Sequence, residues 1–196
     1  MEQLSPKKRF LNINIPIIVR GCQQNDIHCQ EQLYKLFYPE MIKVCSRYAN
    51  DSDGAGTIFN NAMLRIFKSI GEYKEEGKLN AWIKKIVVHC CIDFCKKKVL
   101  YVQNIDEEVN EEVSISSGVF NVISAKEIQK IIGLLPASTG IVFNMYVYEG
   151  FTHKQIGENL GISDGTSKWH LSEAKKILKS KMENFSSTST KVNAAG

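Results

Sequence analysis

The segment FTHKQIGENLGISDGTSKWHLSEAKKIL, residues 151–178, decides the fold of the C-terminal part of this 196-residue chain. Thr152 and Gln155 have the spacing of a capping box, in which two side chains satisfy each other's backbone amides at a helix start. Gly161 lies where that helix must end, because the turn there favours a positive φ. Ser163 follows as the cap of a second helix. These signals predict a helix-turn-helix.

The second helix of this segment has two different faces. Small and apolar side chains form an inward stripe at helical spacing: Ser167, Leu171, Ala174 and Leu178. The opposite face carries amines, an aromatic ring and polar groups: Lys168, Trp169, Ser172, Glu173, Lys175, Lys176 and Lys179. Such groups suit base edges and phosphates in a DNA major groove. An amphipathic hairpin with solvated lysines is the alternative, but caps, glycine and stripe together favour the DNA-binding unit.

Composition and periodicity predict an all-α protein of two small helical domains joined by a flexible acidic linker. The hydrophobic content of 43% is enough for each domain to bury a core. Helical stripes recur in the N-terminal half, whereas residues 99–123 hold five acidic residues, no basic ones and no helical period. The predicted parts are a tail (1–16), an N-terminal helical domain (17–98), the linker (99–121), the helix-turn-helix domain (122–184) and a second tail (185–196).

The last helix of the N-terminal domain is predicted over residues 79–97, with Trp82, Ile86, Cys90 and Phe94 near one face. Cysteines within this helix, with His89 beside them, raise the question of a metal or redox site. Cysteine is a common core residue, and two adjacent cysteines cannot both face one ion on a regular helix. We therefore predict reduced thiols in the core and no metal site.

Other classes of protein find little support in the sequence. No nucleotide-binding glycine loop, metal-ligand carboxylate set or paired nucleophile and base is present, so we predict no catalytic residue, no cofactor and no enzymatic activity. The basic N-terminus precedes a weakly apolar stretch that Asn12, Asn14 and Pro16 interrupt, and no run is long enough to span a bilayer. These features predict a cytoplasmic protein without membrane insertion.

Two sets of motifs flank the linker in a fixed order. The first set is Leu33-Tyr34, Tyr38-Pro39, Arg47-Tyr48, Ile66-Phe67, Tyr73-Lys74, Glu76-Gly77, and Trp82 through Val88 to Asp93. The second set is Leu135-Pro136, Val142–Asn144, Glu149–His153, Gln155–Gly157, Leu160–Ser163, Gly165–Lys168, Leu171 and Ala174-Lys175. With these motifs, residues 17–182 resemble the extracytoplasmic-function group of bacterial sigma factors, particularly the form common in Bacteroidetes. The resemblance implies core RNA polymerase and promoter DNA as partners, and it leaves open an anti-sigma factor as a further one.

The resemblance also implies roles for individual residues. The C-terminal domain would read the upstream, minus-thirty-five element through Thr166, Lys168, Trp169, Ser172, Glu173, Lys175 and Lys176. The N-terminal domain would bind the melting downstream, minus-ten element through Tyr73, Lys78 and Asn80 in the loop 71–80 and through Lys84, Lys85 and His89 on the next helix. Trp169 and Glu173 depart from the small and basic residues usual in the family.

Docking on the polymerase is expected along a helix from Asp51 to Ile70. The candidates there are Asp51, Asp53, Asn60 and Asn61. The family usually carries several acidic residues along this helix, where this chain has Gly56 and the two asparagines. A glycine in a helix costs about 1 kcal/mol relative to alanine. These departures put the strength of polymerase binding in doubt.

A free-standing transcriptional regulator is the alternative to a sigma factor. In that reading the helix-turn-helix acts alone and the N-terminal bundle senses a ligand, metal or redox signal. Its best support is the cysteine group around Cys91 and the depleted docking helix. Tight binding of duplex promoter DNA without polymerase would favour the regulator.

Overall fold

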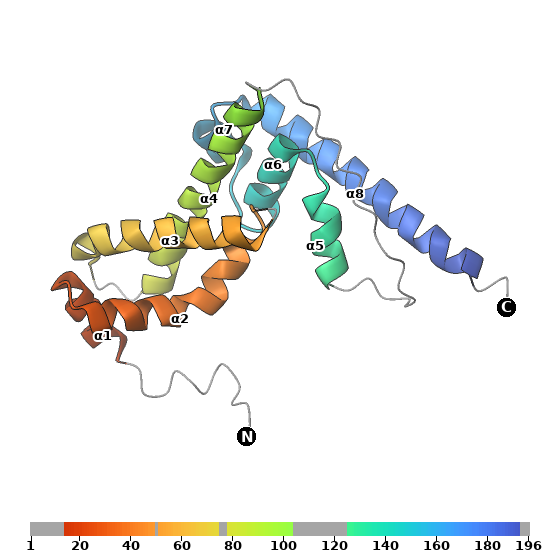
Figure 1. Cartoon of the computed structure of the whole chain (residues 1–196). Coiled ribbons are helices and arrows are strands. Elements are labelled where there is room, and N and C mark those ends of the chain that lie inside the picture. Colours follow the sequence, from red (N-terminus) through yellow and green to blue (C-terminus); the bar gives the residue numbers. More distant parts are fainter. Residues whose placement is uncertain (1–13, 50, 75–77, 104–124, 193–196) are drawn as a thin grey trace. The chain divides into compact units, whose positions relative to one another are not determined.

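The computed structural model of the protein describes residues 14–49, 51–74, 78–103 and 125–192, and all regular secondary structure in these ranges is helical. The elements, labelled in Figure 1, are α1 (Ile15–Gln23), α2 (Ile27–Cys45), α3 (Ser52–Ser69), the short 3-10 helix η2 (Ile70–Glu72), α4 (Leu79–Gln103), α5 (Ala125–Gly133), α6 (Ala137–Val147), α7 (His153–Leu160) and α8 (Asp164–Val192). The prediction of an all-α fold is confirmed.

The helices form two compact units. The first consists of the described residues of Met1–Cys45 and of Asp53–Cys90, and the second of those in Ser46–Ser52 and Cys91–Gly196. Helix α4 thus contributes to both. The predicted domain limits at 98 and 122 follow the sequence motifs and stay a prediction.

The first unit forms because its helices carry apolar stripes that pack on one another. Helices α2 and α3 run in opposite directions (Figure 1), and α1 packs on α2. The buried side chains include Leu33, Phe37 and Met41 of α2 and Ile58, Phe59, Met63 and Ile66 of α3. Full burial of one such side chain contributes about 1.5 to 3 kcal/mol, so these stripes supply the stability of the unit.

The buried face of α4 differs from the predicted one. Ile83, Val87, Cys91 and Cys95 are buried at four-residue spacing, whereas Trp82, Ile86 and Phe94 are only half-buried. The predicted apolar row thus lies at the edge of the buried face, and its fourth member, Cys90, is buried. Apolar residues surround much of this 25-residue helix, so periodicity alone does not identify the face that meets the core.

Three helices extend beyond the limits expected from the sequence. Helix α1 begins within the predicted N-terminal tail, where the Asn14 Oδ1 atom accepts a hydrogen bond from the Ile17 amide at 3.3 Å. Pro16 suits the first turn of a helix, because its missing N–H would have no partner there. Helix α4 continues to Gln103 and α8 to Val192, because residues 98–103 and 185–192 contain no glycine or proline. The rest of the predicted linker and the end of the C-terminal tail lie outside the described residues.

The second unit contains the four helices predicted for the C-terminal part. Helix α8 packs on α5, α6 and α7, and α6 also packs on α7. A polar cluster lies beside the end of α6. In it, the Arg47 guanidinium donates to the Glu149 carboxylate at 2.7 Å, and the Asn144 amide donates to the Arg47 carbonyl at 2.7 Å. Glu149 has a side chain that is only 2% exposed, and its burial is tolerable because the charge is paired.

Candidate nucleic-acid interface

The start of α7 has the capping box that its sequence predicts. The Thr152 hydroxyl accepts from the Gln155 amide at 3.2 Å, and the Gln155 side-chain oxygen accepts from the Thr152 amide at 2.9 Å. At the other end, Gly161 has φ 70° and ψ 33°, and its amide donates to the Gly157 carbonyl at 2.8 Å. Both ends of this helix are therefore fixed by local chemistry.

The turn passes very close to Gly157, a buried residue of α7. A β-carbon at this position would lie 2.6 Å from the Ile162 carbonyl oxygen, which is nearer than real β-carbons approach any atom. The obstacle is backbone, so a side-chain rotation cannot relieve it. Glycine is therefore required at position 157 for the turn to bring α8 against α7.

The start of α8 is also capped as predicted. The Ser163 hydroxyl accepts a hydrogen bond from the Thr166 amide at 3.0 Å, and the two hydroxyl groups are 2.9 Å apart. Asp164 is the first residue of the helix and places a negative charge at its positive end. The hydroxyl of Thr166, a predicted phosphate contact, is thus engaged in the cap.

The two faces of α8 are those that the sequence predicts. Ser167, Leu171 and Ala174 are buried, and Leu178 is half-buried. On the opposite face, Trp169 is 59% exposed. The other exposed candidates for upstream-element contact are Thr166, Lys168, Ser172, Lys175 and Lys176. The structure thus presents amines, hydroxyls and one large aromatic ring on a single solvent-facing surface.

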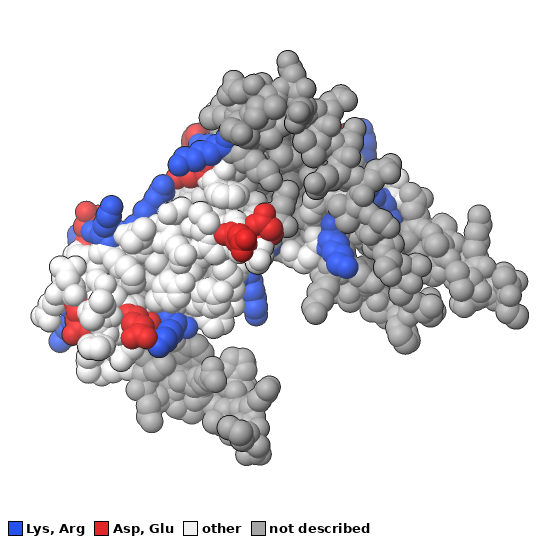
Figure 2. Space-filling model, in the orientation of Figure 1, with Lys and Arg blue, Asp and Glu red and all other residues white. Residues whose placement is uncertain are grey.

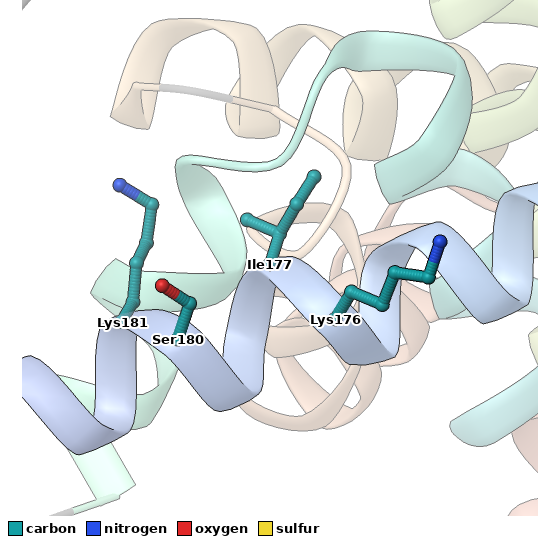
Figure 3. Close-up of a pocket in the computed structure, with 4 residues that line it drawn as sticks. All are labelled: Lys176, Ile177, Ser180 and Lys181. Carbon is teal, nitrogen blue, oxygen red and sulfur yellow. The ribbon is translucent and has the colours of Figure 1, made fainter.

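Glu173, the remaining upstream candidate, lies against a neighbouring lysine. Its carboxylate is 3.4 Å from the Lys176 amine, and its side chain is 33% exposed. A partly exposed pair of this kind contributes less than about 1 kcal/mol, so DNA can exchange it. Lys176 also lines a shallow pocket on α8 together with Ile177, Ser180 and Lys181 (Figure 3).

Two histidines that the sequence analysis did not select connect the helices of this unit. His153 Nδ1 is 2.9 Å from the hydroxyl of the buried Ser167, and the His153 ring stacks on Tyr146 with ring centres 4.7 Å apart. His170 Nδ1 is 3.0 Å from the Thr139 hydroxyl of α6. Burial lowers the pKa of His170 below its usual value. Helical periodicity carries no signal for these contacts, because each joins residues from separate helices.

The candidates for downstream-element contact lie around the start of α4. Tyr73 is half-buried and packs on Trp82, with ring centres 5.2 Å apart. Lys78 and Asn80 are exposed, and residues 75–77 of the predicted loop lie outside the described residues. On the helix itself, Lys85 is exposed, whereas Lys84 and His89 are half-buried. The structure therefore joins Tyr73 to the helix through an aromatic contact.

The docking candidates are exposed on or beside α3. Asp51 precedes the helix, and Asp53, Asn60 and Asn61 are exposed along it. The Tyr34 hydroxyl donates to Asn60 Oδ1 at 3.0 Å, which connects α3 to α2. On the face shown in Figure 2, uncharged side chains cover much of the described surface, and an acidic patch lies among them near its middle. The docking candidates therefore offer two carboxylates, at Asp51 and Asp53, and two amide groups, at Asn60 and Asn61.

The cysteines belong to the core of the protein. Cys22, Cys45, Cys90, Cys91 and Cys95 are buried, and Cys29 is half-buried. Burial raises the pKa of Cys22 to about 11, which keeps that group a thiol at neutral pH. Within the described ranges, no group of three or more histidine, cysteine and acidic residues could hold a metal ion. Among the helices of the same ranges, none is both long enough and apolar enough to cross a bilayer.

Comparison with known proteins assigns both halves of the chain to the same kind of protein. The family described as Sigma-70 region 2 matches residues 33–99, and the family described as Sigma-70, region 4 matches residues 125–178. The chain is similar to the ECF RNA polymerase sigma factor SigM of Mycobacterium tuberculosis. Identity is 20% over 153 residues, which are 78% of this chain and 76% of the relative.

Two solved structures are similar to this chain. One is the sigma factor RpoE in complex with the anti-sigma factor NepR from Bartonella quintana, with a TM-score of 0.50 and 18% identity over 78% of this chain and 96% of that one. Another is CnrH in complex with the cytosolic domain of CnrY, with a TM-score of 0.44 and 10% identity over 86% of this chain and 96% of that one.

Sigma-70 regions 2 and 4 are domains that bind core RNA polymerase and promoter DNA, and their two matches together cover more than half of the chain. The order of the two regions agrees with the order of the two motif sets in the sequence. The chain is a sigma factor of the extracytoplasmic-function type.

Proposed function

We propose that this sigma factor reads the upstream promoter element with the exposed face of α8 and captures the melted downstream element near the start of α4. It docks on core RNA polymerase through α3. The observation that carries the proposal is the surface of α8, where Lys168, Trp169, Ser172 and Lys175 surround a helix whose other face is buried. A capped, rigidly packed helix with such a surface fits a DNA major groove.

The residues of α8 divide into two classes of contact. Lys168, Trp169, Ser172 and Glu173 are proposed to reach base edges, whereas Thr166, Lys175 and Lys176 contact phosphates. Base contacts determine sequence preference, and phosphate contacts determine affinity and its salt dependence. The exchange of the Glu173–Lys176 pair for DNA contacts frees the carboxylate to accept from a cytosine amino group.

Downstream capture is proposed for Tyr73, Lys78, Asn80, Lys84, Lys85 and His89. Unstacked bases bind through stacking and backbone charge, and this group offers an aromatic ring and amines around one helix start. The support is the packing of Tyr73 on Trp82, which holds an aromatic ring against α4, and the exposure of Lys78 and Asn80 at the start of the same helix.

Polymerase docking is proposed for Asp51, Asp53, Asn60 and Asn61. All four are exposed, and the hydrogen bond from Tyr34 fixes the Asn60 side chain on α3. Two of the four are acidic and two are neutral amides, so we expect this binding to depend less on salt than an interface made only of ion pairs does.

Several broader features belong to the same proposal. The domain limits are 17–98 and 122–184, and the form of the sequence is the one common in Bacteroidetes. The protein acts in the cytoplasm, has no catalysis of its own and has an anti-sigma factor as a further partner. The motifs in the sequence support these features, and RpoE was solved with such a partner.

Transcription in vitro with the cognate core polymerase tests the proposal. We expect Lys168→Ala and Trp169→Ala each to change the preference for the upstream element by about 1 to 3 kcal/mol. Lys175→Ala should instead weaken binding to all sequences and reduce the salt slope by about one. Leu178→Met, which keeps volume on the inner face, is the matched control.

Two results would contradict the proposal. One is a folded protein that supports no initiation with its core polymerase. The other is tight, sequence-specific binding of duplex promoter DNA by the protein alone, which is the behaviour of a free-standing regulator. Burial of Cys91 and Cys95 gives little support to a metal or redox sensor in that alternative.

A further inference from the structure

Trp169 is an unusual side chain for its position on α8. The residue is 59% exposed, yet the His170 ring packs against its indole ring. The two ring centres are 4.9 Å apart and the ring planes meet at 69°, which is the edge-to-face arrangement that aromatic pairs prefer. An exposed tryptophan on a helix normally samples several rotamers, so a neighbouring ring restricts its choice.

His170 is itself held in place from α6. Its Nδ1 atom is 3.0 Å from the hydroxyl of Thr139, a residue that is only 3% exposed. The hydrogen bond therefore fixes the imidazole plane from a buried position on another helix. Because α6 and α8 pack directly on each other, this constraint belongs to the core of the unit.

The three side chains form a continuous series of contacts. It begins at a buried threonine on α6, passes through a half-buried histidine and ends at an exposed indole on the predicted DNA-reading face. Neither Thr139 nor His170 belongs to the exposed set of α8. Their connection to that exposed surface runs through Trp169.

We infer that Thr139 and His170 are positioning residues that orient Trp169 for contact with the 5-methyl group of a thymine in the upstream element. The inference rests on the proposed role of α8. A large hydrocarbon surface without a charge gains most from an apolar target, and in the major groove the thymine methyl is that target. The indole N–H supplies one donor for an acceptor on the same or a neighbouring base.

Orientation is the property that distinguishes this arrangement from a freely moving tryptophan. A ring held in one rotamer loses little conformational entropy when it meets the base. If the ring is released, it should still touch DNA but should discriminate less between thymine and other bases. The contacts through His170 therefore set specificity more than affinity.

The first experiment measures the mobility of Trp169 without DNA. The chain has two tryptophans, so Trp82→Phe leaves Trp169 as the only one. In this full-length background we expect Thr139→Val and His170→Ala to lower the fluorescence anisotropy of Trp169. Thr139→Ser keeps the hydroxyl and should restore it. Far-ultraviolet circular dichroism confirms that each variant remains helical.

His170→Asn separates the two contacts. Its side-chain amide can still reach Thr139, but it has no ring to pack against Trp169. We therefore expect the anisotropy to fall as far as in His170→Ala. Unchanged anisotropy in both His170→Ala and Thr139→Val would overturn the inference and would leave the proposed sigma-factor function intact.

The second experiment measures base reading with core polymerase. Replacement of upstream thymines by deoxyuridine removes only the methyl groups. At the position that Trp169 contacts, we expect this to reduce initiation by wild type about tenfold, the lower range for loss of a base contact. The same replacement should have little effect in Trp169→Ala, and Thr139→Val should fall between them. Thr139→Val should add nothing in a Trp169→Ala background, because the two residues act through one contact.

The outcomes are distinguishable. Equal sensitivity of wild type and Trp169→Ala to deoxyuridine overturns the thymine contact, even if initiation is normal. Additive effects of Thr139→Val and Trp169→Ala overturn the positioning role. Failure of the folded wild type to initiate at all is a failure of the proposed function, whereas the anisotropy measurement still decides how Trp169 is held.

Discussion

The helix-turn-helix and the loop at residues 71–80 are both proposed to contact DNA, but they differ in how much of their geometry the chain fixes by itself. In the helix-turn-helix, caps, a glycine turn and a buried stripe determine the position of α8. Among the described residues of the loop, Tyr73 packs on Trp82 and its amide donates to the Ile70 carbonyl, whereas Lys78 and Asn80 are exposed.

The difference corresponds to the two forms of DNA that the regions would bind. Duplex DNA has a regular groove, so a rigid helix with a fixed surface matches it. A melted strand has no fixed shape, and its bases are held by stacking and by charges that adjust around them. We therefore expect mutations in the helix-turn-helix to affect folding and those in the loop to affect promoter opening.

The largest effect should come from Gly157→Ala. The added methyl group would meet the Ile162 carbonyl at 2.6 Å, so α7 and the turn must separate. We expect a loss of about 3 kcal/mol in the free energy of unfolding of the C-terminal half, as for severe overpacking. Urea unfolding followed by circular dichroism measures it. Gly133→Ala is the control, because a methyl group there meets nothing within 4 Å.

An intermediate effect is expected from Thr152→Ala. Loss of the hydroxyl removes the cap on the Gln155 amide and should cost about 1 kcal/mol. Thermal unfolding checks this, with Thr152→Ser as the variant that retains the cap. If the Thr152→Ala and Thr152→Ser proteins are equally stable, the hydroxyl cap contributes nothing. The rigidity of the turn must then come from packing alone.

A smaller, pH-dependent effect should arise from His170. Burial lowers its pKa below the usual value of 6.5, so the folded protein favours the neutral ring. As the pH falls, His170 is therefore protonated at a higher pH in the unfolded chain than in the folded protein. Stability should be constant above about pH 6.5 and should decrease as the pH falls through the lower, folded pKa. Unfolding experiments between pH 7.5 and 5.5 should show this loss in wild type and a weaker one in His170→Gln.

The smallest effect on folding should come from the loop. Lys78→Ala and Asn80→Ala are exposed substitutions, and we expect each to change stability by less than about 0.5 kcal/mol. Promoter opening, followed by permanganate reactivity of unpaired thymines with core polymerase, should nevertheless decrease. A folding loss comparable to that of Thr152→Ala would contradict the contrast between the two regions.

Sequence reasoning succeeded where the determinants are local. The capping box at Thr152, the positive φ of Gly161 and the buried stripe from Ser167 all depend on residues within a few positions of one another. It also predicted the exposed face of α8, because that face is the complement of the stripe. Whether the exposed residues contact DNA remains a prediction.

The remaining features depend on contacts between distant parts of the chain. The core face of α4 could not be chosen from a helix with apolar residues on several sides. The contact of His170 with Thr139 joins residues 31 positions apart, and the Arg47–Glu149 pair joins residues 102 apart. Sequence spacing contains no information on such pairs, since they exist only after the helices have packed.

The buried cysteines can report local unfolding through their reaction with alkylating reagents. Cys22, Cys45 and Cys91 are at most 1% exposed, so an alkylating reagent reaches each sulfur only when the surrounding helices open. The raised pKa of Cys22 slows its reaction further, because the thiolate is the species that reacts. Mass spectrometry of the unmodified sequence would therefore rank the opening of α1, α2 and α4, before and after polymerase binds, without any introduced probe.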